Sequence, residues 1–185
     1  MGHGQIIYLN GTSSSGKTTI ARELQKVLEE PYMYVSVDGF FEMLPERFAQ
    51  EPSRELMISV MSGMHRSVAG LSMAGNNVIV DDVLAGKPFL KECVELLADL
   101  PVLFVGVQCP LEELERRERE RGDRGEGLAR FQYGRVHHYG IYDVEVDTSV
   151  SSPEECAQQI ASALAERASP NAFQRIKEIM EAETE

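Results

Sequence analysis

The chain has 185 residues, and its 18 Lys and Arg against 30 Asp and Glu give a formal net charge of −12. This length suits one domain, and a 43% apolar fraction with 26% charged residues excludes a wholly disordered chain. A surface this acidic repels a phosphate backbone, so we expect no nucleic-acid partner.

Membrane and export signals are missing from the sequence. The longest apolar runs, such as Val102–Val107, are far shorter than the roughly 20 residues of a membrane-spanning helix. No basic start followed by an apolar stretch opens the chain, and Ile6 stands where a myristoylation motif needs Ser or Thr. The three cysteines have no metal-ligand spacing. We therefore expect a cytoplasmic protein whose cysteines are reduced and packed in the structure.

Short apolar runs alternate with longer stretches of helical period, which predicts an α/β fold with a parallel sheet covered by helices. The candidate strands are rich in Val and Ile, as strands buried on both faces are. They are Gln5–Leu9, Met33–Val37, Asn77–Val80, Val102–Val107 and Asp143–Val146.

Apolar spacing, together with Pro and Gly at the ends, places the helices. One follows the first strand and ends before Pro31; others run from about Ser53 to Ala74, from near Lys87, from Leu111 to about Arg121, and from Pro153. Beyond Pro170 the pattern predicts one more amphipathic helix, docked or frayed. We therefore expect one domain over residues 1–169 and a helical tail over 170–185.

The segment 11–18 matches G-x-x-x-x-G-K-[ST] between an apolar strand and a helix, as this phosphate-loop motif requires. Gly11 and Gly16 allow a backbone that gathers several N–H groups around one phosphate, and the start of the following helix adds to that field. Lys17 is expected to reach the β and γ phosphates and Thr18 to bind Mg²⁺. The nucleotide-binding residues predicted here are Gly11, Ser13, Ser14, Ser15, Gly16, Lys17, Thr18 and Thr19.

Carboxylates follow two of the predicted strands, where open α/β sheets bind their ligands. Asp81 or Asp82 can hold Mg²⁺ unless they only cap a turn. Asp38 can accept the proton of a substrate hydroxyl that attacks the γ-phosphate; the alternative is a turn residue before Gly39. The guanine-reading pattern Asn-Lys-x-Asp does not occur in the sequence, which disfavours a GTPase switch.

Seven of the eighteen basic residues are arginines between Arg116 and Arg135. Arg117, Arg121 and Arg124 lie at i, i+4 and i+7, on one face of a helix. Guanidinium groups clamp phosphoryl oxygens, and the glycines that follow can act as hinges. The pattern favours an arginine-rich lid over a nucleotide, at about residues 115–136. The alternative is a solvated helix with internal Glu–Arg pairs.

Several blocks of the sequence resemble one enzyme family. Beside the phosphate loop, they are Val-Asp-Asp at 80–82, Arg-Gly-Asp-Arg at 121–124 and Tyr-Asp-Val-Glu-Val-Asp-Thr at 142–148. From about residue 5 to 165, the chain resembles the chloramphenicol phosphotransferase family, small kinases that phosphorylate an antibiotic hydroxyl. The resemblance implies an ATP- and Mg²⁺-dependent kinase whose five-stranded parallel sheet has the order 2-3-1-4-5.

Asp38 is, by the same resemblance, the base for the acceptor hydroxyl, and the arginine-rich segment closes over ATP. Lys17, Arg121 and Arg124 would neutralise the transferred phosphoryl group, and Arg117 would contact the nucleotide. His137 falls at a matching position, where we expect a structural histidine.

The acceptor stays open at the level of sequence. Residues 40–74 are expected to build much of its pocket, and only Met43-Leu44-Pro45 among them matches the family. Chloramphenicol is the first candidate; a sugar, a nucleoside or another metabolite is the alternative. A regulatory module that switches on ATP without transfer is a third interpretation, against which Asp38 and the arginine-rich segment argue.

Overall fold

A computed structural model describes residues 2–121, 127–166 and 169–183. The strands in these ranges are β1 (Ile6–Asn10), β2 (Tyr32–Ser36), β3 (Asn77–Asp82), β4 (Val102–Gln108) and β5 (Val144–Asp147). The helices are α1 (Lys17–Val27), α2 (Val37–Glu42), α3 (Glu46–Ala49), α4 (Arg54–Met73), α5 (Lys87–Leu97), α6 (Leu111–Arg121), α7 (Leu128–Tyr133), α8 (Pro153–Glu166) and α9 (Ala172–Ala182).

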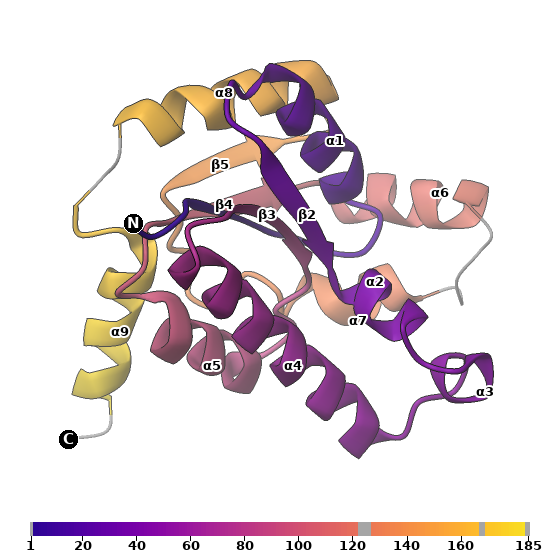
Figure 1. The fold of residues 1–185 in the computed structure, drawn as a ribbon. Helices are drawn as coiled ribbons and strands as arrows, with labels where there is room; N and C mark the ends of the chain where they lie inside the picture. The colour runs from indigo at the N-terminus through magenta and orange to yellow at the C-terminus, as the bar shows by residue number, and fades with distance from the viewer. Residues whose placement is uncertain (1, 122–126, 167–168, 184–185) are drawn as a thin grey trace.

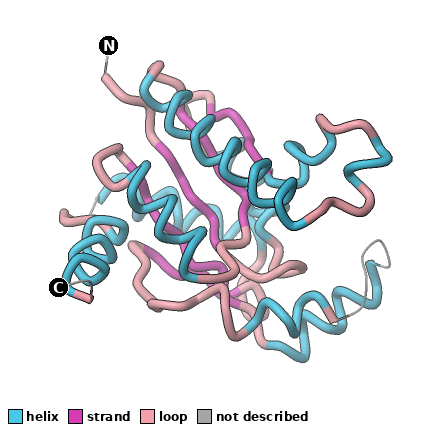
Figure 2. Tube along the Cα trace, turned by 90° about the horizontal axis from the view of Figure 1, so that it is seen from below, coloured by secondary structure: helices cyan, strands magenta, loops and turns pink. Residues whose placement is uncertain are grey.

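All strand pairs are parallel, and the order across the sheet is β2-β3-β1-β4-β5. The α/β architecture and the strand order confirm the sequence-based prediction. Helices α1 and α8 cover one face of the sheet, while α4, α5 and α9 cover the other (Figure 1). Helices α2, α3, α6 and α7 lie beyond the carboxyl ends of the strands, and Figure 2 shows the same three-layer arrangement from below.

The central strand β1 explains how the two layers are held. Ile6 and Tyr8 pack into the core under α4, α5 and α9, while Ile7 and Leu9 pack into the core under α1 and α8. All four are fully buried. A strand covered on both faces needs apolar residues at every position, which is why this segment reads as a continuous apolar run.

The strands extend beyond the apolar runs that predicted them. Asn10 still pairs with Asp82 and with Gly106 in the sheet register, so β1 ends one residue later than expected and β3 two residues later. Polar residues at these ends remain in the ladder because their backbone groups hydrogen-bond there. The ladder thereby fixes the segments that enter the site.

The long helix α4 has the extent that its sequence predicts. Ser53 caps it by accepting a hydrogen bond from the Leu56 N–H at 3.2 Å, and Gly75 follows its end with a φ of 89°. A serine cap and a left-handed glycine are the usual signals for the start and the end of a helix.

The predicted tail helix is docked on the sheet. Asn171 and Gln174 form a capping box at the start of α9. Phe173 and Ile176 are fully buried in the core cluster that contains Phe104. No helix in the described ranges combines the length and the apolar composition of a transmembrane segment.

Candidate active site

The phosphate loop, residues 11–18, joins β1 to α1 at the carboxyl edge of the sheet, and its backbone requires its glycines. A Cβ atom on Gly11 would lie 2.7 Å from the Val107 carbonyl oxygen and 2.7 Å from Ser15 Oγ. Gly16 has a φ of 92° and stands just before α1. The Ser15 N–H donates to the Thr12 carbonyl at 3.1 Å, which closes the turn. The loop therefore has the compact form that its motif predicts.

The loop lysine and threonine meet the carboxylate of Asp81. Lys17 is buried, and its Nζ donates to the carbonyls of Gly11 at 3.0 Å and Thr12 at 3.1 Å. Its distance to Asp81 Oδ1 is 3.7 Å. Thr18 Oγ1 donates to Asp81 Oδ2 at 2.6 Å, and the Tyr34 hydroxyl donates to the same oxygen at 2.9 Å. Asp81 thus joins β3 to the phosphate loop and to β2.

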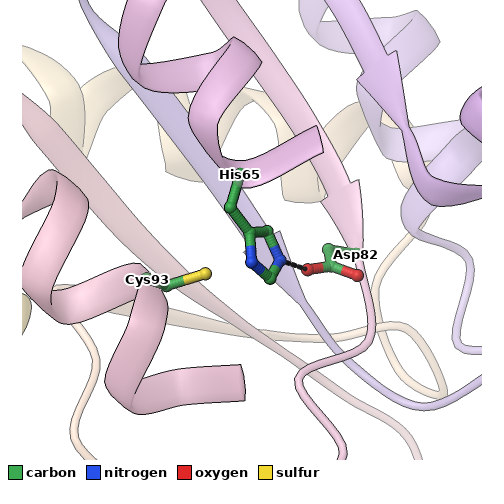
Figure 3. Close-up of side chains that lie close together, drawn as sticks. All are labelled: His65, Asp82 and Cys93. Carbon is green, nitrogen blue, oxygen red and sulfur yellow. Dashed lines mark hydrogen bonds and ion pairs between the residues drawn. The ribbon is translucent and has the colours of Figure 1, made fainter. Parts of the chain in front are cut away.

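Asp82 faces the opposite side of the sheet, because successive side chains of a strand alternate. It is fully buried, and its Oδ2 accepts hydrogen bonds from the Tyr8 hydroxyl at 2.6 Å and from His65 Nε2 at 3.1 Å. Figure 3 shows His65 reaching from α4 to Asp82, with Cys93 beside them on α5. Of the two carboxylates that the sequence nominates for Mg²⁺, only Asp81 lies beside the phosphate loop.

The group around Asp82 is a hydrogen-bonded network. Ligand-type atoms of His65, Asp82 and Cys93 lie within 4.8 Å of one another, but Asp82 is already bonded to His65, and Tyr8 also lies 3.2 Å from Cys93 Sγ. Burial opposes charge on the His65 ring; hydrogen bonding to Asp82, with Cys93 close by, outweighs it and raises the pKa of His65 to about 11. The protonated ring holds the pKa of the Asp82 carboxyl low in spite of burial.

Asp38 lies in the first turn of α2, a helix that the sequence pattern does not predict. Ser36 Oγ caps this helix by accepting from the Gly39 N–H at 3.1 Å. Asp38 lines a cavity of about 530 Å³ together with the phosphate-loop residues Ser13 and Lys17. The cap at Ser36 was the available signal for α2, but a helix of six residues is too short to show a periodic pattern.

Two of the nominated arginines lie at this cavity. Arg121 lines it, and so does Arg117, which donates to the side chain of Thr148 at 3.0 Å and to its carbonyl at 2.8 Å. Thr148 Oγ1 in turn donates to the Ser15 carbonyl at 2.9 Å, so α6 is tied to the phosphate loop. Arg124 lies outside the described residues.

The outer face of α6 has the internal ion pairs that the alternative interpretation expects. Arg116 bonds Glu113 at 2.7 Å and Glu120 at 2.5 Å. The helix therefore combines a solvated face with a face that meets the cavity.

Helix α7 brings an unexpected residue to the loop. Gln132 Oε1 accepts a hydrogen bond from the Ser13 N–H at 2.8 Å. The helix is short, and a glutamine in a charged segment has no spacing that marks it.

His137 shares a hydrogen bond with the Tyr142 hydroxyl at 2.5 Å and is half-buried.

The residues around the cavity fit a nucleoside triphosphate with a divalent cation. The loop offers backbone N–H groups, a buried lysine and a threonine hydroxyl, and Asp81 offers carboxylate oxygens of the kind that Mg²⁺ prefers. Within the described residues, the buried Ser15 Oγ has no hydrogen-bond partner. Together the fold and this site define a P-loop kinase.

The family model of "Chloramphenicol phosphotransferase-like protein" matches residues 4–165. The chain therefore belongs to the chloramphenicol phosphotransferase-like family. A protein named "Putative O-phosphotransferase Rv2636" from Mycobacterium tuberculosis is 30% identical over 202 residues, which cover 96% of this chain and 89% of that protein.

Solved structures show the same fold at low sequence identity. The APS kinase CysC of Mycobacterium tuberculosis superposes with a TM-score of 0.70 at 19% identity and covers 89% of this chain and 99% of its own. The shikimate kinase of Acinetobacter baumannii superposes with a TM-score of 0.65 at 13% identity and covers 88% of this chain and 94% of its own.

Proposed function

We propose that the protein transfers the γ-phosphoryl group of ATP to the hydroxyl group of a small molecule, with chloramphenicol as the first candidate acceptor. One observation carries this proposal: Asp38 shares a single cavity with the phosphate loop. A carboxylate near the end of a bound triphosphate is in position to take a proton from an alcohol. A regulatory nucleotide switch has no need of such a group.

Positioning and charge neutralisation account for most of the catalysis in this class of reaction. The loop N–H groups and Lys17 hold the phosphates, and the lysine moves from its loop carbonyls to the β and γ oxygens. Asp38 orients the acceptor hydroxyl and receives its proton as the oxygen attacks. Arg121, and by the family resemblance Arg124, offset the charge on the transferred group, while Arg117 holds α6 at the loop through Thr148.

The metal site is assigned to Thr18 and Asp81. When bound there, Mg²⁺ neutralises charge on the β and γ phosphates. Asp82 has a different role in this proposal, because its carboxylate belongs to the buried network with His65 and Tyr8.

Exposed apolar side chains on the segment that follows Asp38 support an acceptor with an apolar body. Met43, Phe48 and Met57 are 74%, 45% and 39% exposed on and around α2, α3 and the start of α4. Met61 and Met64, one and two turns further along α4, are buried core residues instead. The two sets divide the segment 40–74 into an exposed part, which is available to an acceptor, and a packing part.

The direct test is to incubate the protein with ATP, Mg²⁺ and a panel of chloramphenicol, sugars and nucleosides, and to search each acceptor by mass spectrometry for one added phosphoryl group. We expect chloramphenicol to be modified. Modification of a different acceptor would support the phosphotransferase activity and show that the acceptor is not chloramphenicol. ADP formation at the same rate with and without every acceptor would contradict transfer to an alcohol.

Substitution of Asp38 tests the base. Asp38→Asn should leave ATP binding nearly intact and lower turnover at least about a hundredfold, since the amide cannot take the proton. Glu42→Gln is the matched control, because Glu42 is an exposed acid on the same helix. Turnover that survives in Asp38→Asn means that Asp38 is not the base.

A further inference from the structure

A side chain from α7 accepts a hydrogen bond from an N–H group of the phosphate loop. Gln132 Oε1 lies 2.8 Å from the Ser13 nitrogen, and Ser13 lines the same cavity as Asp38 and Lys17. A backbone N–H can only donate, so the carboxamide atom that faces it must be the oxygen. The Ser13 N–H therefore does not engage the Nε2 group of Gln132, which carries two N–H donors.

Helix α7 is anchored at both ends, so the position of Gln132 is built into the fold. Glu118 of α6 is 6% exposed, and its carboxylate accepts from the N–H groups of Gly127 and Ala129, at 2.9 Å each. At the other end, Asn10 Nδ2 donates to the Val136 carbonyl at 2.9 Å. Asn10 is the last residue of β1, directly before the phosphate loop. Asn10 and Ser13, which are close in sequence, therefore bind the segment after α7 and the Gln132 side chain, respectively.

The contact lies in the half of the loop that is nearer to β1 in sequence. Ser13 comes four residues before Lys17. The Lys17 Nζ group donates to the carbonyls of Gly11 and Thr12, the two residues before Ser13. Because this lysine reaches the β and γ phosphates when nucleotide binds, the Ser13 end of the loop is the end that meets the terminal phosphate. Within the described residues, Gln132 Nε2 makes no hydrogen bond.

We propose that Gln132 binds the γ-phosphoryl group: its Oε1 stays on the Ser13 N–H, and its Nε2 donates to a γ-phosphoryl oxygen. The inference rests on the proposed function, because it assumes a bound triphosphate. A neutral amide held at a fixed point can stabilise charge on the transferred group without reorganising during the reaction. Glutamine suits this position because it accepts and donates at adjacent atoms.

Nucleotide affinity tests the proposal without an acceptor. Gln132→Glu keeps an oxygen for the Ser13 N–H but replaces the donor with a negative oxygen that faces the phosphate. Isothermal titration with Mg²⁺ would compare ADP with the ATP analogue that has an imido group between its β and γ phosphates. We expect the analogue to bind at least about tenfold more weakly to the variant, and ADP to change less than about threefold.

Two further variants complete the test. Gln132→Met has similar length and no hydrogen-bonding amide, and it should also lower the preference for the triphosphate over ADP. Gln158→Glu makes the same charge change on an exposed position of α8 and should leave both affinities unchanged. If the preference stays the same in both Gln132 variants, or if Gln132→Glu weakens both nucleotides equally, Gln132 is only a clamp on the loop and the proposal is wrong.

The outcomes separate this inference from the proposed function. If the Gln132 variants keep the preference for the ATP analogue over ADP, and transfer depends on Asp38, the proposed role of Gln132 is wrong and the proposed phosphotransferase activity is supported. A selective loss of triphosphate affinity in a protein that phosphorylates no alcohol supports the γ-phosphoryl contact and overturns the transfer. Failure of the unaltered protein to bind either nucleotide overturns both.

Discussion

His65 is a charged side chain with no exposed surface, and the network around it explains how the fold accommodates that charge. An unpaired buried imidazolium would be strongly destabilising. His65 instead lies between two carboxylates, at 3.1 Å from Asp82 and 3.0 Å from Glu92. Glu92 also pairs with Arg66, which is exposed. The network therefore runs from the surface to Asp82, the neighbour of Asp81, and supports the end of β3 from the face opposite the phosphate loop.

A pH dependence of stability follows from the His65 charge. The native pKa is raised to about 11 from 6.5, so above about pH 6.5 the native state keeps a proton that the unfolded chain releases. The stabilisation is complete below pH 6.5 and is lost as the pH rises towards 11. The gap in unfolding free energy between the unaltered protein and His65→Gln should shrink between pH 7 and 10, by up to about 1.4 kcal/mol per unit.

Urea unfolding at several pH values measures that gap. His138→Gln is the control, because His138 is an exposed histidine outside the network. A gap between the unaltered protein and His65→Gln that does not change with pH would mean that His65 is neutral in the native state.

Among the elements, α7 depends most clearly on a tertiary contact. Its first turn has no cap from its own side chains, since the residue before it is Gly127. The N–H groups at the start of a helix need acceptors, and the Glu118 carboxylate supplies them from α6. A carboxylate also interacts favourably with the positive end of the helix. The pair α6 and α7 is therefore one unit, in which Glu118 sets the place of Gln132.

Removal of this cap should loosen α7. Glu118→Ala removes the acceptor of the Gly127 and Ala129 N–H groups, and because the Ala129 N–H is buried its loss costs about 1–3 kcal/mol. We expect faster hydrogen exchange at the α7 amides and weaker binding of the ATP analogue. Glu112→Ala changes an exposed acid of the same helix and should alter neither. Unchanged exchange at α7 in folded Glu118→Ala would show that α7 does not need the cap.

These elements also show what the sequence could predict. The family resemblance implies the strand order, and the apolar period and end signals of α4 predict its extent. Helices α2 and α7 are too short for a period, and α7 needs an acceptor from another helix. The alternation of a strand implies that only one of Asp81 and Asp82 faces the loop, but it does not say which. Gln132 and Ser13 are 119 residues apart, so local sequence could not reveal their contact.

At the scale of the whole molecule, the tail helix completes the core on the face that carries the His65 network. Phe173 of α9 lies with its ring centre 4.5 Å from that of Phe104 and 5.8 Å from that of Tyr8. Tyr8 is the residue that donates to Asp82. The Ala172 N–H also donates to Asp143 Oδ1 at 2.7 Å, just before β5. Helix α9 thus covers Tyr8, which contacts the His65 network, on the face of the sheet opposite the phosphate loop.

Truncation and substitution test whether the division after residue 169 marks the end of the folding unit. Phe173→Ala should lower the free energy of unfolding by about 3–5 kcal/mol, because it opens a cavity in a fully buried cluster. Ile179→Ala, on the exposed side of the same helix, should cost about 1 kcal/mol or less. A chain that ends at residue 169 should lose cooperative unfolding, because the removal of α9 exposes Phe104 and Tyr8. If that shorter chain melts like the full one, and Phe173→Ala costs no more than Ile179→Ala, α9 is an appendage and the core is complete without it.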